Sequence, residues 1–223
     1  MSVVAIIPAR GGSRGIPHKN LQRLGGLPLV RWPINAAREC RSVDAVYVST
    51  DSNQIAVTSE YGATVIHRPS RLAIDSALTP PVVVHAIEAI APAPEIVVVL
   101  QCTTPFTSAE DIDQAVGLLL KDAETDVVVS VCPCHIHQLR LIPRGVEWMT
   151  PGGIYETPRR QDRPPTYRLN GGIFVYRVEA FLAAQLAIYG TVRLHVMPEE
   201  RSLEIDTPYD LTMARAYYET MGG

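Results

Sequence analysis

A glycine-rich, basic segment near the start of the chain carries the clearest chemical signal. It reads Ala9-Arg10-Gly11-Gly12-Ser13-Arg14-Gly15-Ile16-Pro17-His18-Lys19-Asn20. The glycines let backbone N–H groups approach an anion closely, and Arg10, Arg14 and Lys19 add positive charge. A polyphosphate needs both features, so the segment predicts polyphosphate binding, with a solvated, flexible turn as the alternative. The segment contains neither GxxxxGK[ST] nor GxGxxG, so it is not either of those nucleotide-binding motifs.

A pair of acids near the other end of the chain could hold a divalent cation. Glu204 and Asp206 stand two residues apart in an apparent strand, which places them on one face about 6.6 Å apart along the strand. Mg²⁺ prefers a few carboxylates together with phosphate oxygens and water. Helix capping is the alternative, but Thr207, Pro208 and Asp210 already supply a cap, a first-turn proline and an acid at the third helical position. We therefore predict that Asp206 and Glu204 are metal ligands.

The elements that must position these residues alternate between strands and helices. Strands are expected at Val3–Ile7, Ala45–Val48, Ala63–Ile66, Glu95–Leu100, Asp126–Val131, Gly171–Tyr176, Val192–Met197 and Leu203–Ile205. Helices are expected at Leu27–Glu39, from the Ser49-Thr50-Asp51 cap to Glu60, and at Pro81–Ile90, Ser108–Lys121, Glu179–Ile188 and Pro208–Thr220. Repeated βα units predict an α/β fold with a mostly parallel sheet and helices on both faces. Ligands of such sheets bind beyond the carboxyl ends of the strands, where the glycine-rich segment begins.

The alternating pattern breaks between residues 132 and 169, where prolines, glycines and arginines crowd together. We expect an excursion from the sheet that covers the site or meets a partner subunit. Four arginines lie close together there: Arg159, Arg160, Arg163 and Arg168. An exposed charge run is usually just solvated, but two prolines stiffen this one. Without a repeat or a linker, we expect residues 1–223 to form a single domain.

Composition excludes several classes of protein. The 223 residues are 47% hydrophobic and 19% charged, which is typical of a folded domain rather than a disordered segment. A net charge of −3 disfavours a nucleic-acid coat or a polybasic membrane binder. The first apolar run ends at Arg10, too early for a signal core or a spanning helix. Four scattered cysteines do not suggest a disulfide framework, so we expect a reduced, cytoplasmic protein.

Six blocks of this sequence resemble the CMP-sialic acid synthetase (acylneuraminate cytidylyltransferase) family, in the same order. They are IIPARGGSRGIPHKN at 6–20, VSTDS at 48–52, HRPSRLAIDSA at 67–77, LQCTTPF at 100–106, RRQDRPPTYRLNGGIFVY at 159–176 and LEIDTPYDL at 203–211. The resemblance implies a Rossmann-like nucleotidyltransferase fold, CTP as substrate, Mg²⁺ as cofactor and a homodimer. It also implies transfer of CMP to an acidic acceptor with loss of pyrophosphate.

The resemblance also implies roles for individual residues. Those matching nucleotide-binding positions are Arg10, Gly11, Gly12, Ser13, Arg14, Lys19, Asn20, Arg68 and Gln101, with Arg10, Lys19 and Asp206 as the catalytic set. Those matching acceptor-binding positions are Arg140, Arg160, Gln161, Asn170 and Phe174. Many relatives carry lysine in place of Arg14, proline in place of Cys102 and aspartate in place of Glu204.

The acceptor pattern departs from that of sialate enzymes. Phe174 stands where those enzymes carry tyrosine, which removes one hydroxyl from the acceptor site. The acceptor is therefore left open among sialic acid, other nonulosonic acids and small phosphonates. A nucleotidyltransferase using another nucleotide or a sugar phosphate is one rival interpretation, and a non-catalytic nucleotide-binding regulatory protein is another. The presence of Lys19, Glu204 and Asp206 disfavours the regulatory protein, because nucleotide binding alone does not need metal ligands.

Overall fold

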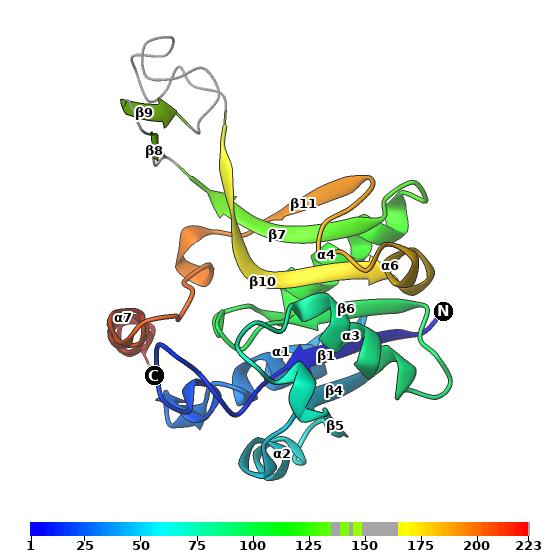
Figure 1. Cartoon of the computed structure of the whole chain (residues 1–223), viewed down its shortest axis with the longest axis horizontal. Coiled ribbons are helices and arrows are strands. Elements are labelled where there is room, and N and C mark those ends of the chain that lie inside the picture. Colours follow the sequence, from blue (N-terminus) through cyan, green and yellow to red (C-terminus); the bar gives the residue numbers. More distant parts are fainter. Residues whose placement is uncertain (135–138, 143–144, 149–164, 223) are drawn as a thin grey trace.

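A computed structural model describes residues 1–134, 139–142, 145–148 and 165–222, and it is built on a seven-stranded sheet (Figure 1). The order is β11-β7-β10-β6-β1-β4-β5. These strands span Val3–Pro8 (β1), Ala45–Thr50 (β4), Thr64–His67 (β5), Ile96–Leu100 (β6), Val127–Pro133 (β7), Tyr167–Arg177 (β10) and Val192–Val196 (β11). Only β10 is antiparallel, pairing with β6 and β7 in that direction, while the other pairs are parallel. The expected mostly parallel α/β sheet is confirmed.

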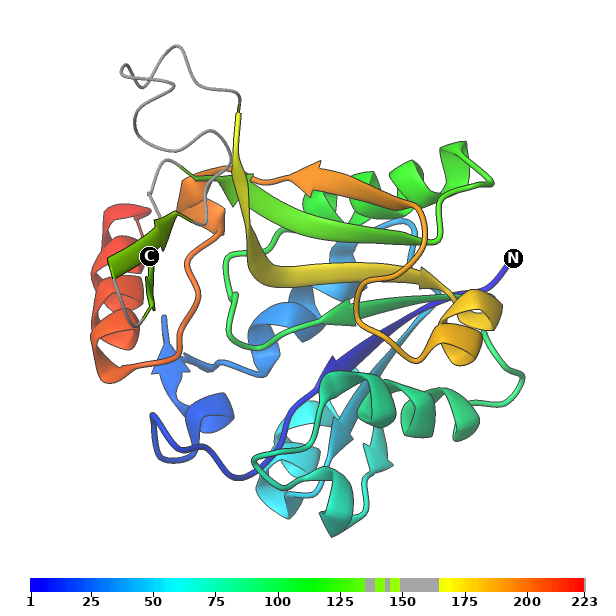
Figure 2. The same ribbon diagram turned by 45° about the horizontal axis from the view of Figure 1, so that its top comes forward.

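Helices cover both faces of the sheet (Figure 2). One face packs against α1 (Arg31–Glu39), α2 (Asn53–Ser59) and α4 (Ala109–Lys121), and the other against α3 (Thr79–Glu88) and α6 (Val178–Ala184). Alternate residues of the central strands feed the two resulting cores: Ala5 and Ile7 point to the first, and Val4 and Ile6 to the second. The strands read as continuous apolar runs because both of their faces are buried.

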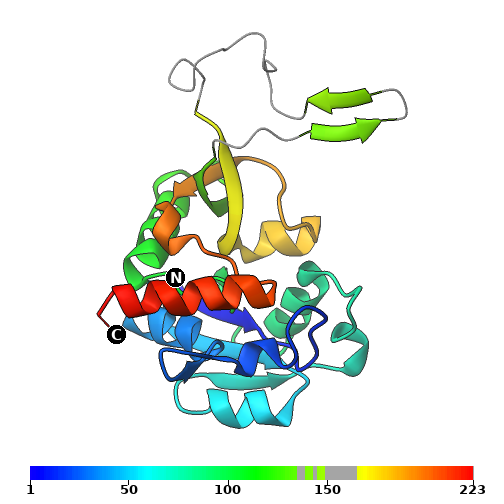
Figure 3. The ribbon, with the colours of Figure 1, turned by 90° about the vertical axis from the view of Figure 1, so that its left-hand side faces the viewer.

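A third, smaller core lies beyond the carboxyl ends of the strands. It joins Ile16, Leu24, Leu29, Phe106, Ile205, Leu211 and Ala214. The helix α7 (Pro208–Thr220), red in Figure 3, lies next to the blue N-terminal segment and contacts the small hairpin of β2 (Arg23–Leu24) and β3 (Leu27–Pro28). This core brings Ile16 of the glycine-rich segment against Ile205, which separates the two predicted metal ligands.

One expected element is wrong in type, and another begins later than expected. Leu203–Ile205 forms no strand within the described chain, because its neighbour is the loop after β6 rather than a sheet edge. Leu27 and Pro28 form β3, and the helix expected from Leu27 begins only at Arg31. Pro33 then falls in the first turn, where its missing N–H is not needed.

Boundaries shifted at three further places. Ser52, rather than the preceding cluster, caps α2 through its side chain. The helix expected at Glu179–Ile188 is α6, which ends at Ala184. Parts of the 132–169 excursion belong to the sheet, since β7 runs to Pro133 and β10 starts at Tyr167. Two short strands, β8 (Leu139–Ile142) and β9 (Gly145–Trp148), pair only with each other. The single-domain assignment remains a prediction.

The four cysteines lie in the interior of the protein. Cys40, Cys102, Cys132 and Cys134 are all buried and free. Throughout the part of the chain that the structure describes, no helix is both long enough and apolar enough to cross a bilayer.

Candidate nucleotide site

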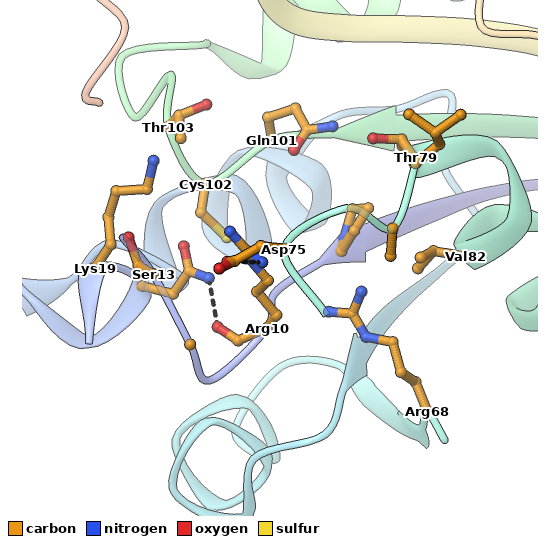
Figure 4. A pocket seen from close by; sticks show the side chains of 15 residues that line it. Arg10, Ser13, Lys19, Arg68, Asp75, Thr79, Val82, Gln101, Cys102 and Thr103 are labelled. Carbon is orange, nitrogen blue, oxygen red and sulfur yellow. Dashed lines mark hydrogen bonds and ion pairs between the residues drawn. The ribbon is translucent and has the colours of Figure 1, made fainter. Parts of the chain in front are cut away.

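A cavity of about 210 Å³ opens at the carboxyl ends of β1 and β6 (Figure 4). Seven of the nine predicted nucleotide-binding residues line it: Arg10, Gly12, Ser13, Lys19, Asn20, Arg68 and Gln101. Its remaining lining residues are Pro8, Asp75, Ala77, Leu78, Thr79, Val82, Cys102 and Thr103. The fold therefore gathers residues from four separated stretches of sequence around one space. A parallel sheet places a ligand at this edge.

The glycine-rich loop is shaped by packing against the acidic segment. A Cβ at Gly15 would overlap the backbone carbonyl oxygen of Asp206, so only glycine fits there. Ile16 is buried in the third core. The Asn20 side chain donates a hydrogen bond from Nδ2 to the carbonyl oxygen of Arg10, 2.9 Å away, which ties the two ends of the loop together. These contacts fix the shape of the loop beside the cavity.

Lys19 connects the cavity with the acidic pair. Its ammonium nitrogen donates to Oδ1 of Asp206 at 2.8 Å and to the carbonyl oxygen of Ile205 at 3.1 Å. The Lys19 side chain is only 16% exposed, whereas that of Asp206 is 60% exposed. The predicted catalytic lysine and the predicted metal ligand are thus adjacent.

The two arginines of the loop share a partner that sequence reasoning missed. Nη1 of Arg10 lies 2.6 Å from Oδ1 of Asp75, and Nε of Arg14 lies 2.5 Å from Oδ2. A second unforeseen acid, Asp51, accepts a hydrogen bond from the Gly11 N–H at 2.9 Å. Both acids lie in blocks quoted for the family resemblance, but nothing in their spacing indicates that they face the loop.

Arg68 is a buried cation in the cavity wall. It is 7% exposed, and its Nη1 and Nη2 donate to the carbonyl oxygens of Leu72 and Ser49. Its Nε has no hydrogen-bond partner among the described residues. Burial lowers the pKa of Arg68, and the charge of Asp51 partly opposes that shift. A buried guanidinium without a paired carboxylate is costly, so an acceptor group on a ligand would stabilise it.

Gln101 and Cys102 follow directly after β6 and line the cavity. Gln101 is half-buried, so its side chain can present both a donor and an acceptor to a base. Burial raises the pKa of the Cys102 thiol to about 12. A thiol with so high a pKa is protonated at neutral pH and is no nucleophile.

The two predicted metal ligands are both exposed, although the segment that holds them is not a strand. The backbone N–H of Ile205 donates to the carbonyl oxygen of Thr103 at 2.8 Å, and its buried side chain leaves Glu204 and Asp206 on the opposite, accessible side. Desolvation and then the charge of Asp206 raise the pKa of Glu204, while Arg168 and Lys19 oppose the shift. Two carboxylates that repel each other favour a bound cation.

The donor set also fits Mg²⁺. Within residues 1–134 and 165–222 and the two short strands between them, no group of three or more His, Cys, Asp or Glu side chains could hold a metal. Mg²⁺ does not need such a cage, since it is usually bound by one or two carboxylates plus phosphate oxygens and water. Thr207 and Asp210 form a capping box at the start of α7, so Asp206 is not the cap.

Among the predicted acceptor residues, Asn170 has its side chain in the interior. Asn170 is fully buried and bonded on every side: its Oδ1 accepts from Ser130 and from the Gly172 N–H, and its Nδ2 donates to Ser202 and to the Met197 sulfur. In this structure the Asn170 side chain joins β10, β7 and the segment before Glu204, and its acceptor-binding role stays a prediction.

The other acceptor positions are less informative. Phe174 stacks on Tyr176 with ring centroids 6.3 Å apart, is half-buried against the second core and does not line the cavity. Arg140 belongs to β8, and Arg160 and Gln161 lie outside the described residues.

An ion pair between the buried Asp111 and the partly exposed Arg201 fixes the turn before the acidic segment. Asp111, in the first turn of α4, accepts two hydrogen bonds from Arg201 at 2.8 and 2.9 Å and lies 3.3 Å from Nε2 of His195. Burial alone would raise the pKa of Asp111, but the hydrogen bonds from His195, Arg201 and Ser108 hold it well below its ordinary value. Arg201 precedes Glu204 by three residues, so this pair anchors the turn that leads to the predicted metal ligands.

Comparison with known sequences identifies the family of this chain. A family model described as "Cytidylyltransferase" matches residues 4–168. The CMP-N,N'-diacetyllegionaminic acid synthase of Legionella pneumophila is 31% identical over 229 residues, covering 98% of this chain and 97% of that protein. The N-acylneuraminate cytidylyltransferase of Escherichia coli is 31% identical over 217 residues, covering 95% of this chain and 51% of that protein. The chain thus spans about half the length of several curated relatives it matches, N-acylneuraminate cytidylyltransferase B of Danio rerio among them.

Solved structures share the fold at low sequence identity. A CMP:2-keto-3-deoxy-manno-octonic acid synthetase complexed with CTP superposes with a TM-score of 0.77 at 18% identity, covering 99% of this chain and 100% of that one. A 4-diphosphocytidyl-2C-methyl-D-erythritol synthase from Anaerococcus prevotii gives a TM-score of 0.70 at 16% identity, covering 98% of this chain and 96% of that one.

Proposed function

This chain belongs to the cytidylyltransferase family, and from that premise we propose that it transfers CMP from CTP to an acidic acceptor and releases pyrophosphate. The observation that carries the proposal is the position of Lys19. It lines the cavity and also contacts Asp206, so one cation joins the predicted phosphate-binding loop to the predicted metal ligand. A protein that only bound a nucleotide would not need a lysine that contacts both the cavity and Asp206.

The proposed reaction is an in-line displacement at the α-phosphorus. The acceptor oxygen attacks, the bond from the α-phosphorus to the bridging oxygen breaks, and pyrophosphate leaves. Such transfers depend on positioning and charge stabilisation rather than on a covalent enzyme intermediate. In this proposal Arg10, Arg14 and Lys19 bind the departing pyrophosphate and stabilise the charge that it gains.

Asp206 and Glu204 would hold Mg²⁺ together with phosphate oxygens. When bound, the ion would neutralise phosphate charge and polarise the bond that breaks. Arg68 and Gln101 would contact the nucleoside part. We expect Gln101 and backbone groups to distinguish cytosine, which presents an N4 donor and O2 and N3 acceptors, from uracil.

We propose a nonulosonic acid as the acceptor. Support comes from the relatives named for N-acylneuraminate and N,N'-diacetyllegionaminic acid and from the charge of Arg168, which acts on the predicted metal ligand Glu204. A small phosphonate is the second candidate, because Phe174 removes a hydroxyl that a sugar acid could use. The proposal includes a homodimer in which the 132–169 excursion meets the partner.

Pyrophosphate release with CTP across a panel of acidic acceptors tests the function. We expect turnover with at least one nonulosonic acid, and N-acetylneuraminic acid should not be the best acceptor by kcat/KM. If kcat/KM for N-acetylneuraminic acid exceeds that of every other acceptor by tenfold or more, which corresponds to about 1.4 kcal/mol, our interpretation of Phe174 is contradicted. CTP binding without release across the whole panel would favour the regulatory protein instead.

A further inference from the structure

Asp75 bridges the two walls of the nucleotide cavity. It lies in the segment between the 3₁₀ turn Ser70–Leu72 and α3, opposite the glycine-rich loop, and it lines the cavity beside Arg10 (Figure 4). Its two carboxylate oxygens are divided between two partners, with Oδ1 facing Arg10 and Oδ2 facing Arg14. Within the described chain, its side chain makes no other hydrogen bond.

This arrangement resembles the way that arginines hold a phosphate. Two oxygens of one anion accept hydrogen bonds from two guanidinium groups, and guanidinium binds carboxylate and phosphate through the same fork of donors. The hydrogen bonds from Arg14 and then Arg10 hold the pKa of Asp75 below its ordinary value, so the group is ionised at neutral pH. A polyphosphate entering the cavity would meet this negative charge at the donors that it needs.

Other donors of the loop hold the chain's own carboxylates too. The Gly11 N–H donates to Asp51, and the Lys19 ammonium donates to Asp206. Asp75 differs from Asp206, because Asp206 is a predicted metal ligand and therefore still has a function when a nucleotide is bound. It also differs from Asp51, whose charge acts on the buried Arg68. Only Asp75 is left without a role in the proposed reaction.

We propose that Asp75 is a displaceable internal counter-ion: it holds Arg10 and Arg14 in the nucleotide-free chain and leaves them when a polyphosphate binds. The proposal rests on the proposed function and adds a regulation of the same site. Binding then exchanges a carboxylate for phosphate at the same donors. The free energy of breaking the two ion pairs is subtracted from the affinity for pyrophosphate, which eases its release.

Direct binding of inorganic pyrophosphate by titration calorimetry tests this. Asp75→Asn keeps the shape but removes the charge, and the side chain is 36% exposed with no bond into the core, so the fold should persist. We expect the Kd for pyrophosphate to fall by about threefold to tenfold, because each partly exposed ion pair contributes only a small free energy.

Asp122→Asn is the matched control. Asp122 forms a comparable ion pair, 2.7 Å from Nη2 of Arg193, at the end of α4 and therefore at the amino ends of the strands. The Asp122→Asn variant removes the same charge from the protein as Asp75→Asn does, and its Kd for pyrophosphate should equal that of the wild type. Equal or weaker binding by Asp75→Asn would overturn the proposal, because Asp75 would then orient the arginines for the ligand.

Hydrogen exchange of the wild type gives a second measurement. Residues 73–78 should exchange faster when pyrophosphate is bound, and slower exchange would overturn the proposal. The two proposals can fail separately. Tighter pyrophosphate binding by Asp75→Asn with no release from CTP for any acceptor would reject only the proposed function. CMP transfer by the wild type with an unchanged Asp75→Asn affinity would reject only the counter-ion.

Discussion

The ammonium nitrogen of Lys19 lies 2.8 Å from Oδ1 of Asp206, across 187 positions of sequence. The pair joins the loop that leaves the first strand to the segment that enters the last helix. The third core holds both sides in place through Ile16 and Ile205. Because a lysine that neutralises Asp206 competes with a bound cation, we expect the pair to loosen when the acids hold a metal.

Asp206→Ala should abolish turnover while the fold persists, because the side chain is accessible and caps no helix. Asp210→Ala is the contrasting variant. Asp210 completes the capping box of α7, so its loss should cost about 1 kcal/mol of unfolding free energy. Steady-state rates at saturating Mg²⁺ and thermal melts measure both. A near-normal rate for Asp206→Ala would refute the metal-ligand assignment, and a large fall in its Tm would point to a structural role.

Lys19→Ala should lower kcat by about 100-fold, the loss typical of one group that stabilises charge in a transition state. The affinity for CTP should change much less, because the bridging oxygen gains charge only as the bond breaks. Lys19→Arg is the control: it keeps the charge but changes the geometry, so an intermediate rate is expected. If only the apparent affinity for CTP changes, Lys19 is a ground-state anchor.

Gly15→Ala should destabilise the protein by about 1–3 kcal/mol, since its Cβ would meet the backbone of Asp206, which cannot rotate away. Gly12→Ala is the matched control in the same loop, where a Cβ would meet nothing within 4 Å. Chemical denaturation at neutral pH compares the two. Equal stabilities would mean that the loop does not dock on the acidic segment.

Asp111→Asn should cost about 2 kcal/mol at neutral pH, because the buried Asp111 loses its charge-assisted hydrogen bonds to Arg201, while the Arg201 side chain is 39% exposed and stays hydrated. The pKa of Asp111 is lowered in the folded chain, so its contribution is complete above the ordinary Asp pKa of about 3.9 and is lost as the pH falls below that value. Denaturation curves should therefore converge for wild type and variant in acid. A difference in unfolding free energy between wild type and variant that stays constant from neutral pH to pH ~2 would rule out an ionic role for Asp111.

CTP should be preferred over UTP, because Gln101 stands at the cavity wall where a cytosine edge can be read. A site that hydrogen-bonds one pattern rejects the other by leaving buried polar groups unpaired. Initial rates of pyrophosphate release with a working acceptor provide the measurement, with Gln101→Ala as the variant that should narrow the difference. Equal rates from both nucleotides would show that the wild-type pocket does not read the base.

Local patterns in the sequence were sufficient for much of the architecture. Continuous apolar runs such as Ile96–Leu100 indicate strands that are buried on both faces, and the Thr207-Pro208 start of α7 was predicted from its cap alone. These features depend on neighbours within a few residues, so the sequence shows them directly. The glycine-rich loop and its basic residues were found in the same way, because anion binding needs those residue types close together.

Contacts between distant residues were decided only by the tertiary structure. Asp75 meets Arg14 across 61 positions, and Asn170 meets Ser202 across 32, which places a predicted acceptor residue in an internal hydrogen-bond hub. Leu203–Ile205 has strand-like alternation, yet it lies beside the loop after β6 and finds no strand to pair with. Residue type and spacing describe what a side chain can do. Which partner it meets depends on how the sheet and the three cores bring separate segments together.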